Sequence, residues 1–244
     1  MTKPSKNSVP RPRLMCFGDP HDDFRFVIHS VLRHAPEAII LLGDLQAQRP
    51  LQIELAPILA LTEVWFVHGN HDTDSEADFD NLFKSELAHR NVHGRVVEIA
   101  GVRVAGLGGV FRESIWAPPL APAFNSVAER LKCIRPSERW RGGIPLRHRS
   151  SIWPDEYARL SRQRADVLVT HEALGGHPHG WTALDELASS MGVRMVAHGH
   201  LHEQIDYHAE GRLPKDCGYV AFGVGPDFFL TWPRTASPFE RGFA

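Results

Sequence analysis

Residues 38–44 read Ala38-Ile39-Ile40-Leu41-Leu42-Gly43-Asp44, a continuous apolar run that stops at a glycine and an aspartate. A short run without polar alternation is typical of a strand whose two faces are both buried. Such strands occur in parallel sheets, which need helical crossovers and covering layers. The stretch therefore predicts an α/β fold, with a polar residue at the carboxyl end of the strand.

The same pattern occurs elsewhere in the chain, where other apolar runs also end in polar residues. These runs are 13–18, before Asp19-Pro20-His21; 64–67, before His68-Gly69-Asn70-His71-Asp72; 166–170, before His171; and 193–197, before His198-Gly199-His200-Leu201-His202. Parallel α/β sheets collect their chemistry at the carboxyl ends of strands. We therefore expect these polar side chains to lie together at one edge of the sheet.

The intervening segments carry helix, hairpin and strand signals. Apolar residues at helical spacing predict helices over 24–32, 51–61 (despite Pro57) and 76–90. Residues 95–99 and 102–106 are expected to pair as a hairpin around Ala100-Gly101, and short strands are expected around 219–222 and 228–232. The alternation of strands with helical segments supports the α/β prediction.

The composition is that of a globular protein: 43% of the 244 residues are hydrophobic and 23% are charged. The net charge of −2 argues against a dedicated nucleic-acid binder. Three widely spaced cysteines predict reduced thiols and a cytoplasmic location. Residues 1–12 lack a signal-peptide core and are expected to form a flexible tail, with one domain over 13–244 and no membrane span.

The polar residues at the strand ends are those of a metal site. Imidazole, carboxylate and amide oxygen suit Mn, Fe and Zn, while the absence of thiolates argues against a structural zinc cluster. Two such ions about 3.5–4 Å apart can clamp the attacking and leaving oxygens of a phosphoryl transfer. A hydroxide that bridges them would then be the nucleophile at neutral pH.

In chain order the blocks are Asp-x-His, Gly-Asp, Gly-Asn-His-Asp, His and Gly-His-x-His, and together they resemble the calcineurin-like metallophosphoesterase superfamily. The resemblance spans residues 19–202 and implies a sandwich of two mixed β-sheets flanked by helices. It also implies two divalent ions, manganese foremost and iron, zinc or nickel as alternatives, and hydrolysis of a phosphomonoester or phosphodiester. The residues implied are, at the first ion, Asp19, His21 and His202; as the bridge, Asp44; at the second ion, Asn70, His171 and His200; and as the acid for the leaving oxygen, His71.

The chain departs from the family pattern in one important place. Many members carry Gly-Asp-x-x-Asp, whose last carboxylate pairs with the catalytic histidine, whereas residues 43–47 read Gly43-Asp44-Leu45-Gln46-Ala47. We therefore expect Asp72 or another group to orient His71. The same departure argues against a serine/threonine protein phosphatase, and Leu201 stands where many members carry Thr.

Residues 112–164 differ from the rest of the chain, with 11 Arg or Lys against 5 Asp or Glu. An irregular, solvated insertion is the preferred interpretation. The alternative is a cap whose arginines meet the phosphate of the substrate. The expected partner is a phosphate-ester substrate. Two alternative functions stay open: a nuclease that would use this basic segment, and a non-catalytic scaffold. The sequence does not specify the oligomeric state.

Other histidines have weaker functional interpretations. His177 lies in a glycine-rich loop soon after His171. The sequence favours contact with substrate and a structural role equally for this residue. His198 would share a strand face with His200, and we expect it to support the site rather than to bind.

Overall fold

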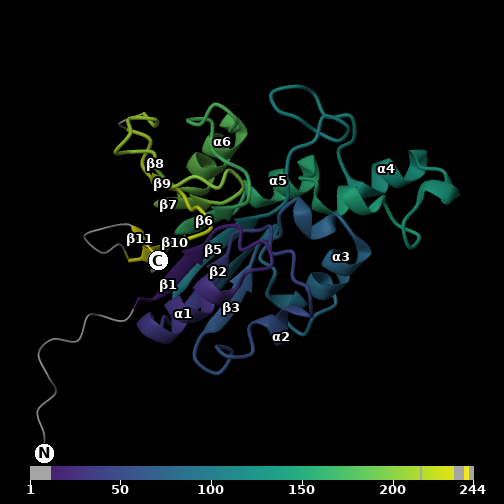
Figure 1. Cartoon of the computed structure of the whole chain (residues 1–244). Coiled ribbons are helices and arrows are strands. Elements are labelled where there is room, and N and C mark those ends of the chain that lie inside the picture. Colours follow the sequence, from purple (N-terminus) through teal and green to yellow (C-terminus); the bar gives the residue numbers. More distant parts are fainter. Residues whose placement is uncertain (1–11, 215, 234–238, 242–244) are drawn as a thin grey trace, which may run out of the picture.

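The computed structural model describes residues 12–214, 216–233 and 239–241 (Figure 1). The strands are β1 (Leu14–Phe17), β2 (Ala38–Leu41), β3 (Glu63–Phe66), β4 (Arg95–Ile99), β5 (Val102–Leu107), β6 (Val167–Thr170), β7 (Met195–His198), β8 (Ile205–Asp206), β9 (Val220–Gly223), β10 (Phe228–Trp232) and β11 (Phe239–Arg241). They form a five-stranded sheet of order β11-β10-β1-β2-β3 and a six-stranded sheet of order β4-β5-β6-β7-β9-β8. The prediction of two mixed sheets is confirmed.

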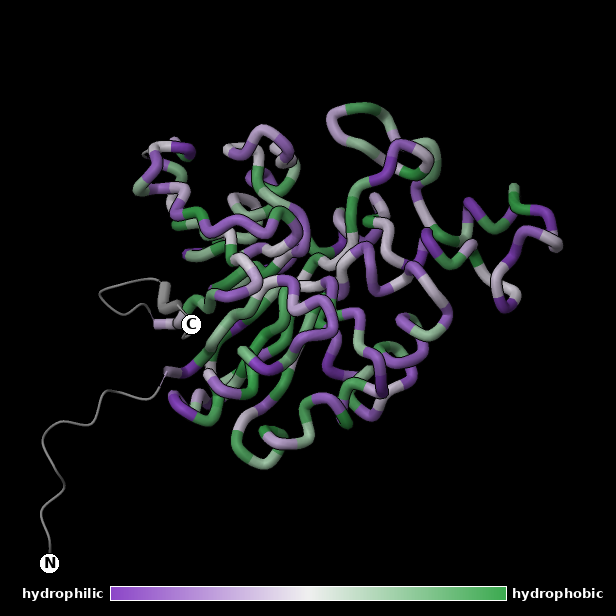
Figure 2. Tube along the Cα trace, in the orientation of Figure 1, coloured by the Kyte–Doolittle hydropathy of each residue, from purple (hydrophilic) through white to green (hydrophobic). Residues whose placement is uncertain are grey.

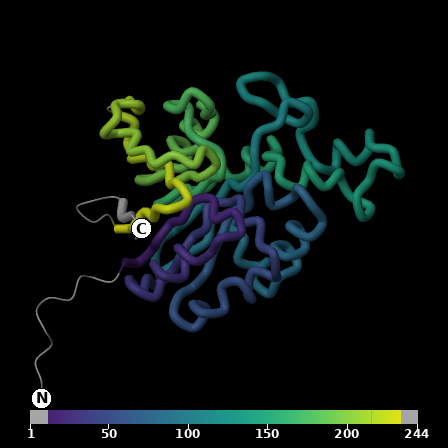
Figure 3. Tube along the Cα trace, in the orientation of Figure 1, coloured from purple at the N-terminus to yellow at the C-terminus, as the bar shows by residue number. Residues whose placement is uncertain are grey.

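Each sheet combines a run of parallel strands with antiparallel strands at one edge of the first sheet and at both edges of the second. In the first sheet β1, β2 and β3 are parallel, and β10 returns antiparallel to β1, which places the last part of the chain beside the first strand (Figure 3). In the second sheet β5, β6, β7 and β9 are parallel, with β4 and β8 antiparallel at the edges. The carboxyl ends of neighbouring parallel strands therefore lie together.

Helices flank the two sheets (Figure 1). The α-helices are α1 (Arg25–His34), α2 (Leu51–Glu54), α3 (Glu76–Phe83), α4 (Val127–Cys133), α5 (Pro154–Leu160) and α6 (Thr182–Met191). The 3₁₀ turns are η1 (His71–Thr73), η2 (Ala88–Arg90), η3 (Pro136–Glu138) and η4 (Leu146–Ser150). Ser75 begins α3 with a capping box, and Gly192 ends α6 in the left-handed conformation.

The side-chain alternation of the strands explains why the sheets have layers on both sides. Leu14 and Ile40 belong to the core between the two sheets, whereas their neighbours Met15 and Ile39 belong to the core beneath α1. All four are completely buried, and burial of such a side chain contributes about 1.5–3 kcal/mol. Figure 2 shows the apolar strands at the centre and polar residues in the surrounding loops.

Two of the predicted helices are shorter than expected. The helix expected over 51–61 ends at Glu54, because Pro57 has no backbone N–H and disfavours helical geometry in the residue before it. The helix expected over 76–90 ends at Phe83, where the hydroxyl of Ser85 donates to the carbonyl of Leu82, and it is followed by the separate turn η2.

The segment 112–164 contains little regular structure apart from α4 and α5. It has a small hydrophobic cluster of its own, made by Ile115, Ile134, Ile144 and Trp153. Of the tail expected over 1–12, residues 1–11 lie outside the described part of the chain. Among the described residues, none of the helices has the length and apolar character needed to cross a bilayer.

Candidate metal centre

The structure brings the polar residues from five strand ends together. Asp19 and His21 follow β1, Asp44 follows β2, and Asn70 follows β3, all in the five-stranded sheet. The remaining residues come from the six-stranded sheet, with His171 after β6 and His200 and His202 after β7. The site therefore lies where the carboxyl ends of the two sheets approach each other.

The backbone at these loops is unusual. Asp19, His21, Asp44, His200 and His202 all have positive φ, between 38° and 71°. This left-handed conformation is unfavourable for residues with a side chain and costs about 1–3 kcal/mol where it is strained. Five such residues at one place indicate a geometry that serves the site rather than the stability of the fold.

One group of potential metal-ligand atoms surrounds the ring of His171. The Nε2 atom of His171 lies 3.1 Å from Asn70 Oδ1, 3.3 Å from Asp44 Oδ2 and 3.1 Å from His200 Nδ1. The other ring nitrogen, Nδ1, donates to the carbonyl oxygen of Leu42 at 2.8 Å. That hydrogen bond leaves Nε2 as the atom that faces the group.

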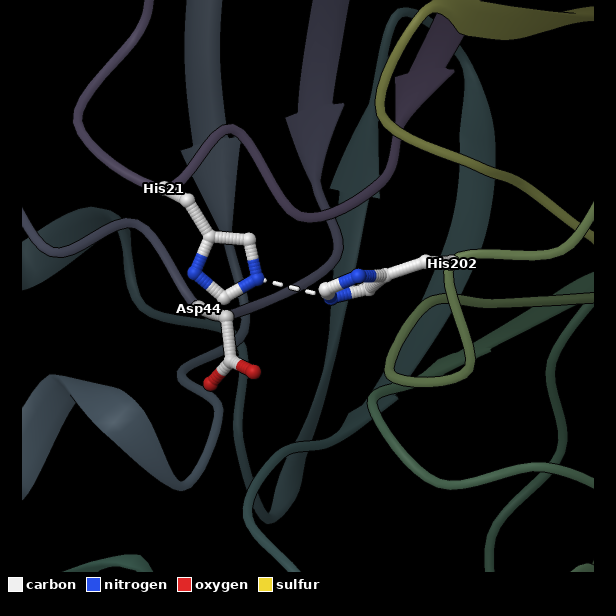
Figure 4. Close-up of side chains that lie close together, drawn as sticks. All are labelled: His21, Asp44 and His202. Atoms are coloured by element: carbon white, nitrogen blue, oxygen red, sulfur yellow. Dashed lines mark hydrogen bonds between the residues drawn. The ribbon is translucent and has the colours of Figure 1, made fainter.

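The second group shares Asp44. His21 and His202 approach through their Nε2 atoms at 2.7 Å, and Asp44 lies beside them (Figure 4). The Nδ1 atom of His21 lies 2.6 Å from Gln46 Oε1, to which it donates. Because Asp44 belongs to both groups, it lies in the position of a bridge.

Asp19 is completely buried, and its Oδ1 atom lies 3.7 Å from Nδ1 of His171. Its Oδ1 atom accepts from the backbone N–H of His200 at 2.9 Å, while its buried Oδ2 has no hydrogen-bond partner among the described residues. Burial raises the pKa of Asp19 to about 7, against the opposing charge of His171. An unpartnered buried carboxylate oxygen of this kind is suited to a cation.

The electrostatics of the site also suit cations. Burial, together with the charge of His171, lowers the pKa of His200 to about 4, so this imidazole is neutral at pH 7. Burial alone would lower the pKa of His171, but the hydrogen bond and charge of Asp44 raise it to about 9. At neutral pH and without metal, His171 is therefore protonated, and its positive charge occupies the place that a metal ion would take.

Two glycines allow this close packing. A Cβ atom on Gly69 would lie 2.1 Å from Asp44 Oδ1 and 2.6 Å from His171 Cε1. A Cβ atom on Gly43, whose φ is +103°, would lie 2.3 Å from His171 Nδ1. Any side chain at either position would therefore separate the bridge from its neighbours.

These residues fit two divalent ions. Carboxylate and amide oxygens and imidazole nitrogens converge at each group, and around His171 a divalent ion can take the place of the proton that the ring holds without metal. The second nitrogens of His21 and His171 have acceptors of their own, as is usual for metal-binding histidines. Glu172 Oε2 lies 3.9 Å from His200 Nε2, farther than a hydrogen bond.

His71 lies beside the metal-binding groups on η1. Its ring centroid lies 5.6 Å from that of His21, and its Nδ1 lies 2.5 Å from Asp74 Oδ2. Partial burial acts to lower the pKa of His71, but the hydrogen bond with Asp74 and the charge of Asp44 raise it above its usual value. The ring is therefore held partly exposed and favours its protonated form.

Of the two possibilities for the residue that orients His71, Asp72 or another group, the hydrogen bonds favour another group, Asp74. The carboxylate of Asp72 is buried and accepts backbone N–H groups from Leu45 at 2.8 Å, Gln46 at 2.9 Å and Gly69 at 2.8 Å. It thus joins the loop after β2 to the loop after β3. Asp74 takes the orienting place because it lies one helical turn after His71 and shares its face.

Sequence reasoning missed three supporting residues. Gln46 holds His21, Asp74 holds His71, and Glu172 lies against His200. The spacing of Asp74 from His71 is a usable signal on a short helical turn. Gln46 and Glu172 act across the fold, and only tertiary structure places them.

Two other histidines, His198 and His177, are buried and make their hydrogen bonds to neighbouring groups. His198 is buried, with Nδ1 bonded to the carbonyl of Gly199 and Nε2 2.8 Å from the hydroxyl of Tyr207, as expected of a supporting residue. His177 is also buried, and its Nδ1 accepts from the backbone of His179 within the glycine-rich loop. His177 thus has a structural role in its own loop.

Comparison with known proteins agrees with this geometry. The model of the calcineurin-like phosphoesterase family matches residues 12–204. An uncharacterized protein of Haemophilus influenzae is 43% identical over 193 residues, 79% of this chain and 84% of that protein. The crystal structure of TT1561 of Thermus thermophilus superposes with a TM-score of 0.59 and 15% identity, over 96% of this chain and 99% of that one, which shows a shared fold.

Proposed function

This chain belongs to the calcineurin-like phosphoesterase family, and from that premise we propose that it hydrolyses phosphate esters at a centre of two divalent metal ions. Asp19, His21 and His202 would hold the first ion and Asn70, His171 and His200 the second, with Asp44 between them. Manganese is the foremost candidate, and iron, zinc or nickel suit the same donors.

The observation that carries the proposal is the arrangement around His171 Nε2. Three further donor atoms lie within 3.3 Å of it, and its tautomer is fixed from behind by Leu42. These four potential ligand atoms, one of them on a carboxylate shared with the second group, support a metal-binding arrangement in which an ion replaces the His171 proton. The scaffold alternative is disfavoured because it gives no reason to keep this geometry.

When bound, the two ions would supply an activated water and a Lewis acid for the phosphoryl oxygens. The protein side chains would supply the rest. His71, protonated at Nε2 and held at Nδ1 by Asp74, would give its proton to the leaving oxygen. Asp44 would hold the two ligand groups in position relative to each other. Its Oδ2 lies 3.3 Å from His171 Nε2, and its Oδ1 accepts from the backbone N–H of His71.

The test uses metal-stripped protein reloaded separately with manganese, iron, nickel and zinc. Hydrolysis of p-nitrophenyl phosphate and of bis-p-nitrophenyl phosphate is measured for each, with Asp44→Asn as the inactive variant and Asp155→Asn, an exposed aspartate of α5, as the matched control. Metal-dependent hydrolysis that Asp44→Asn abolishes and Asp155→Asn preserves is the expected result. Absence of hydrolysis with two metals bound would overturn the proposal for these ester classes.

The preferred substrate also bears on the nuclease alternative. Preference for the diester, together with cleavage of oligonucleotides and a steep loss of binding with salt, would favour a nuclease. Preference for the monoester would direct the search to small phosphorylated metabolites.

A further inference from the structure

Part of the positive charge on segment 112–164 is neutralised by α3. The guanidinium of Arg141 pairs with Glu76 at 2.8 Å and with Asp80. Trp140 packs edge-on against Phe79 and donates from Nε1 to Glu76 at 2.8 Å. These contacts fasten the tip of the segment to the helix that follows η1.

Three other arginines of the segment form no such ion pair, although the carboxylates of Asp74 and Glu172 lie close enough to Arg112 to interact with its charge. Within residues 12–214, 216–233 and 239–241, no acidic side chain forms an ion pair with Arg112, Arg130 or Arg147. The Nε atoms of Arg112 and Arg130 are buried without an acceptor. The guanidinium of Arg130 lies over the ring of Phe124, 4.7 Å from its centroid, and Arg147 is exposed.

The three arginines gather around the buried ring of His148. The Nε atom of Arg147 lies 3.4 Å from His148 Nε2. Burial, and then the charges of Arg147, Arg112 and Arg130, lowers the pKa of His148 to about 4. The neutral imidazole offers no charge to compensate them, and Asp74 and Glu172 act on Arg112, so the cluster of three guanidinium groups keeps an excess of positive charge.

The cluster adjoins the metal centre. Arg112 donates from Nη2 to the hydroxyl of Ser150 at 3.3 Å, which lies 2.7 Å from the hydroxyl of Thr73. Thr73 in turn donates to the carbonyl oxygen of Asn70 at 3.2 Å. Two hydroxyl groups therefore connect the guanidinium of Arg112 to the loop that carries Asn70 and His71.

A guanidinium is the preferred partner of phosphate because its planar array of N–H donors matches two oxygens at once. Leaving several of these donors unpaired beside one another is unfavourable without an anion. Resting on the function proposed above, we propose that Arg112 and Arg147, with Arg130 behind them, bind a second phosphate group of the substrate. The preferred substrate is then a small molecule with two phosphate groups, one hydrolysed and one held by the segment.

The local character of the charge favours a small molecule over a nucleic-acid strand. Arg141 is neutralised by α3, and Arg149 lies over the ring of Trp140, 5.6 Å from its centroid, turned toward the same anchored tip. These two arginines thus lie at the anchored tip and leave three arginines in the cluster, whereas a strand needs several phosphate contacts in a row.

The test compares two chromogenic substrates, the p-nitrophenyl ester of thymidine 5′-monophosphate with and without a 3′-phosphate. We expect kcat/KM to be about ten- to a hundredfold higher with the second phosphate, the usual effect of a charge-assisted hydrogen bond. Arg112→Gln and the exposed Arg147→Gln should each reduce that preference at least about fivefold. Arg162→Gln, an exposed arginine of the same segment, should keep the ratio of the unmodified protein.

Equal kcat/KM for the two substrates, or a preference that survives in both Gln variants, would overturn the inference while leaving the phosphoesterase function intact. If neither substrate is hydrolysed, the phosphoesterase proposal fails for diesters, and calorimetry still tests the arginines. Thymidine 3′,5′-bisphosphate must then bind the metal-loaded protein more tightly than thymidine 5′-monophosphate, and only while Arg112 and Arg147 are present. If oligonucleotides bind more tightly than the bisphosphate, the result would favour the nuclease function and reject the arginine cluster as a site for a single second phosphate.

Discussion

The Nδ1 atom of His171 lies 2.8 Å from the carbonyl oxygen of Leu42, the first residue after strand β2. This single hydrogen bond joins the two sheets, because His171 belongs to the six-stranded sheet and Leu42 continues a strand of the five-stranded one. It also decides which ring nitrogen faces Asp44. The same contact therefore links the two sheets and orients the ring of His171.

Metal binding should release protons. Burial raises the pKa of Asp19 to about 7, and the hydrogen bond and charge of Asp44 raise that of His171 to about 9 against burial, so the metal-free site holds protons on these two groups at pH 7. Both must leave when metal binds, so metal affinity should rise with pH until about pH 9. Calorimetric titration in buffers of different ionisation enthalpy measures the number released, and a heat of binding independent of the buffer would contradict the prediction.

Gln46 should matter for one ion and not the other. Replacing it with alanine frees Nδ1 of His21, and the loss of such a partner typically weakens metal binding about 10–100-fold. The second ion, held around His171, should bind almost as before. Competition titrations with a chromogenic chelator resolve the two affinities, and Gln48→Ala, two residues along the same loop, is the control. Equal weakening of both ions would show that Gln46 has a wider structural role.

Asp74 should set the pH dependence through His71. A general acid must be protonated, so activity should fall as pH rises through the pKa of His71. Because Asp74 raises that pKa, Asp74→Asn should move the alkaline limb of the kcat profile to lower pH. His71→Ala should lower turnover by about 10²–10⁴ with metals still bound. In that background Asp74→Asn should no longer move the profile, and a shift that persists would exclude the pairing as its cause.

Asp72 should contribute to the stability of the fold rather than to the orientation of His71. Asp72→Ala leaves three backbone N–H groups without their acceptor, and the free energy of unfolding should fall by about 3 kcal/mol or more. Urea denaturation of the metal-free protein measures this directly. Asp155→Ala, at the exposed start of α5, should change stability by no more than about 1 kcal/mol. A similar small effect at Asp72 would mean that the two loops hold their shape without it.

The sequence predicted much of this structure because the deciding features are local. Continuous apolar runs locate β1, β2 and β3, and the residues that follow them reach the site simply because parallel strands end together. The hairpin of β4 and β5 was predicted from its Ala-Gly turn in the same way. Periodicity failed at 51–61, where a proline outweighs the helical pattern.

The supporting contacts depend on distant parts of the chain and left no local signal. The carbonyl of Leu42 and the side chain of His171 are 129 positions apart, and a backbone acceptor carries no sequence signature. Gln46 precedes Ala47, the position at which the family carboxylate is missing, yet it serves His21 rather than His71. The exchange of roles between Asp72 and Asp74 follows from the turn η1, whose geometry the sequence pattern did not specify.

The pairing of ligand groups across Asp44 is tested most directly by crystals of the protein soaked in manganese and measured for anomalous scattering. We expect two peaks about 3.5–4 Å apart on either side of Asp44, one beside His21 and His202 and the other beside His171 and His200. A single peak, or peaks away from these side chains, would contradict the two-metal centre.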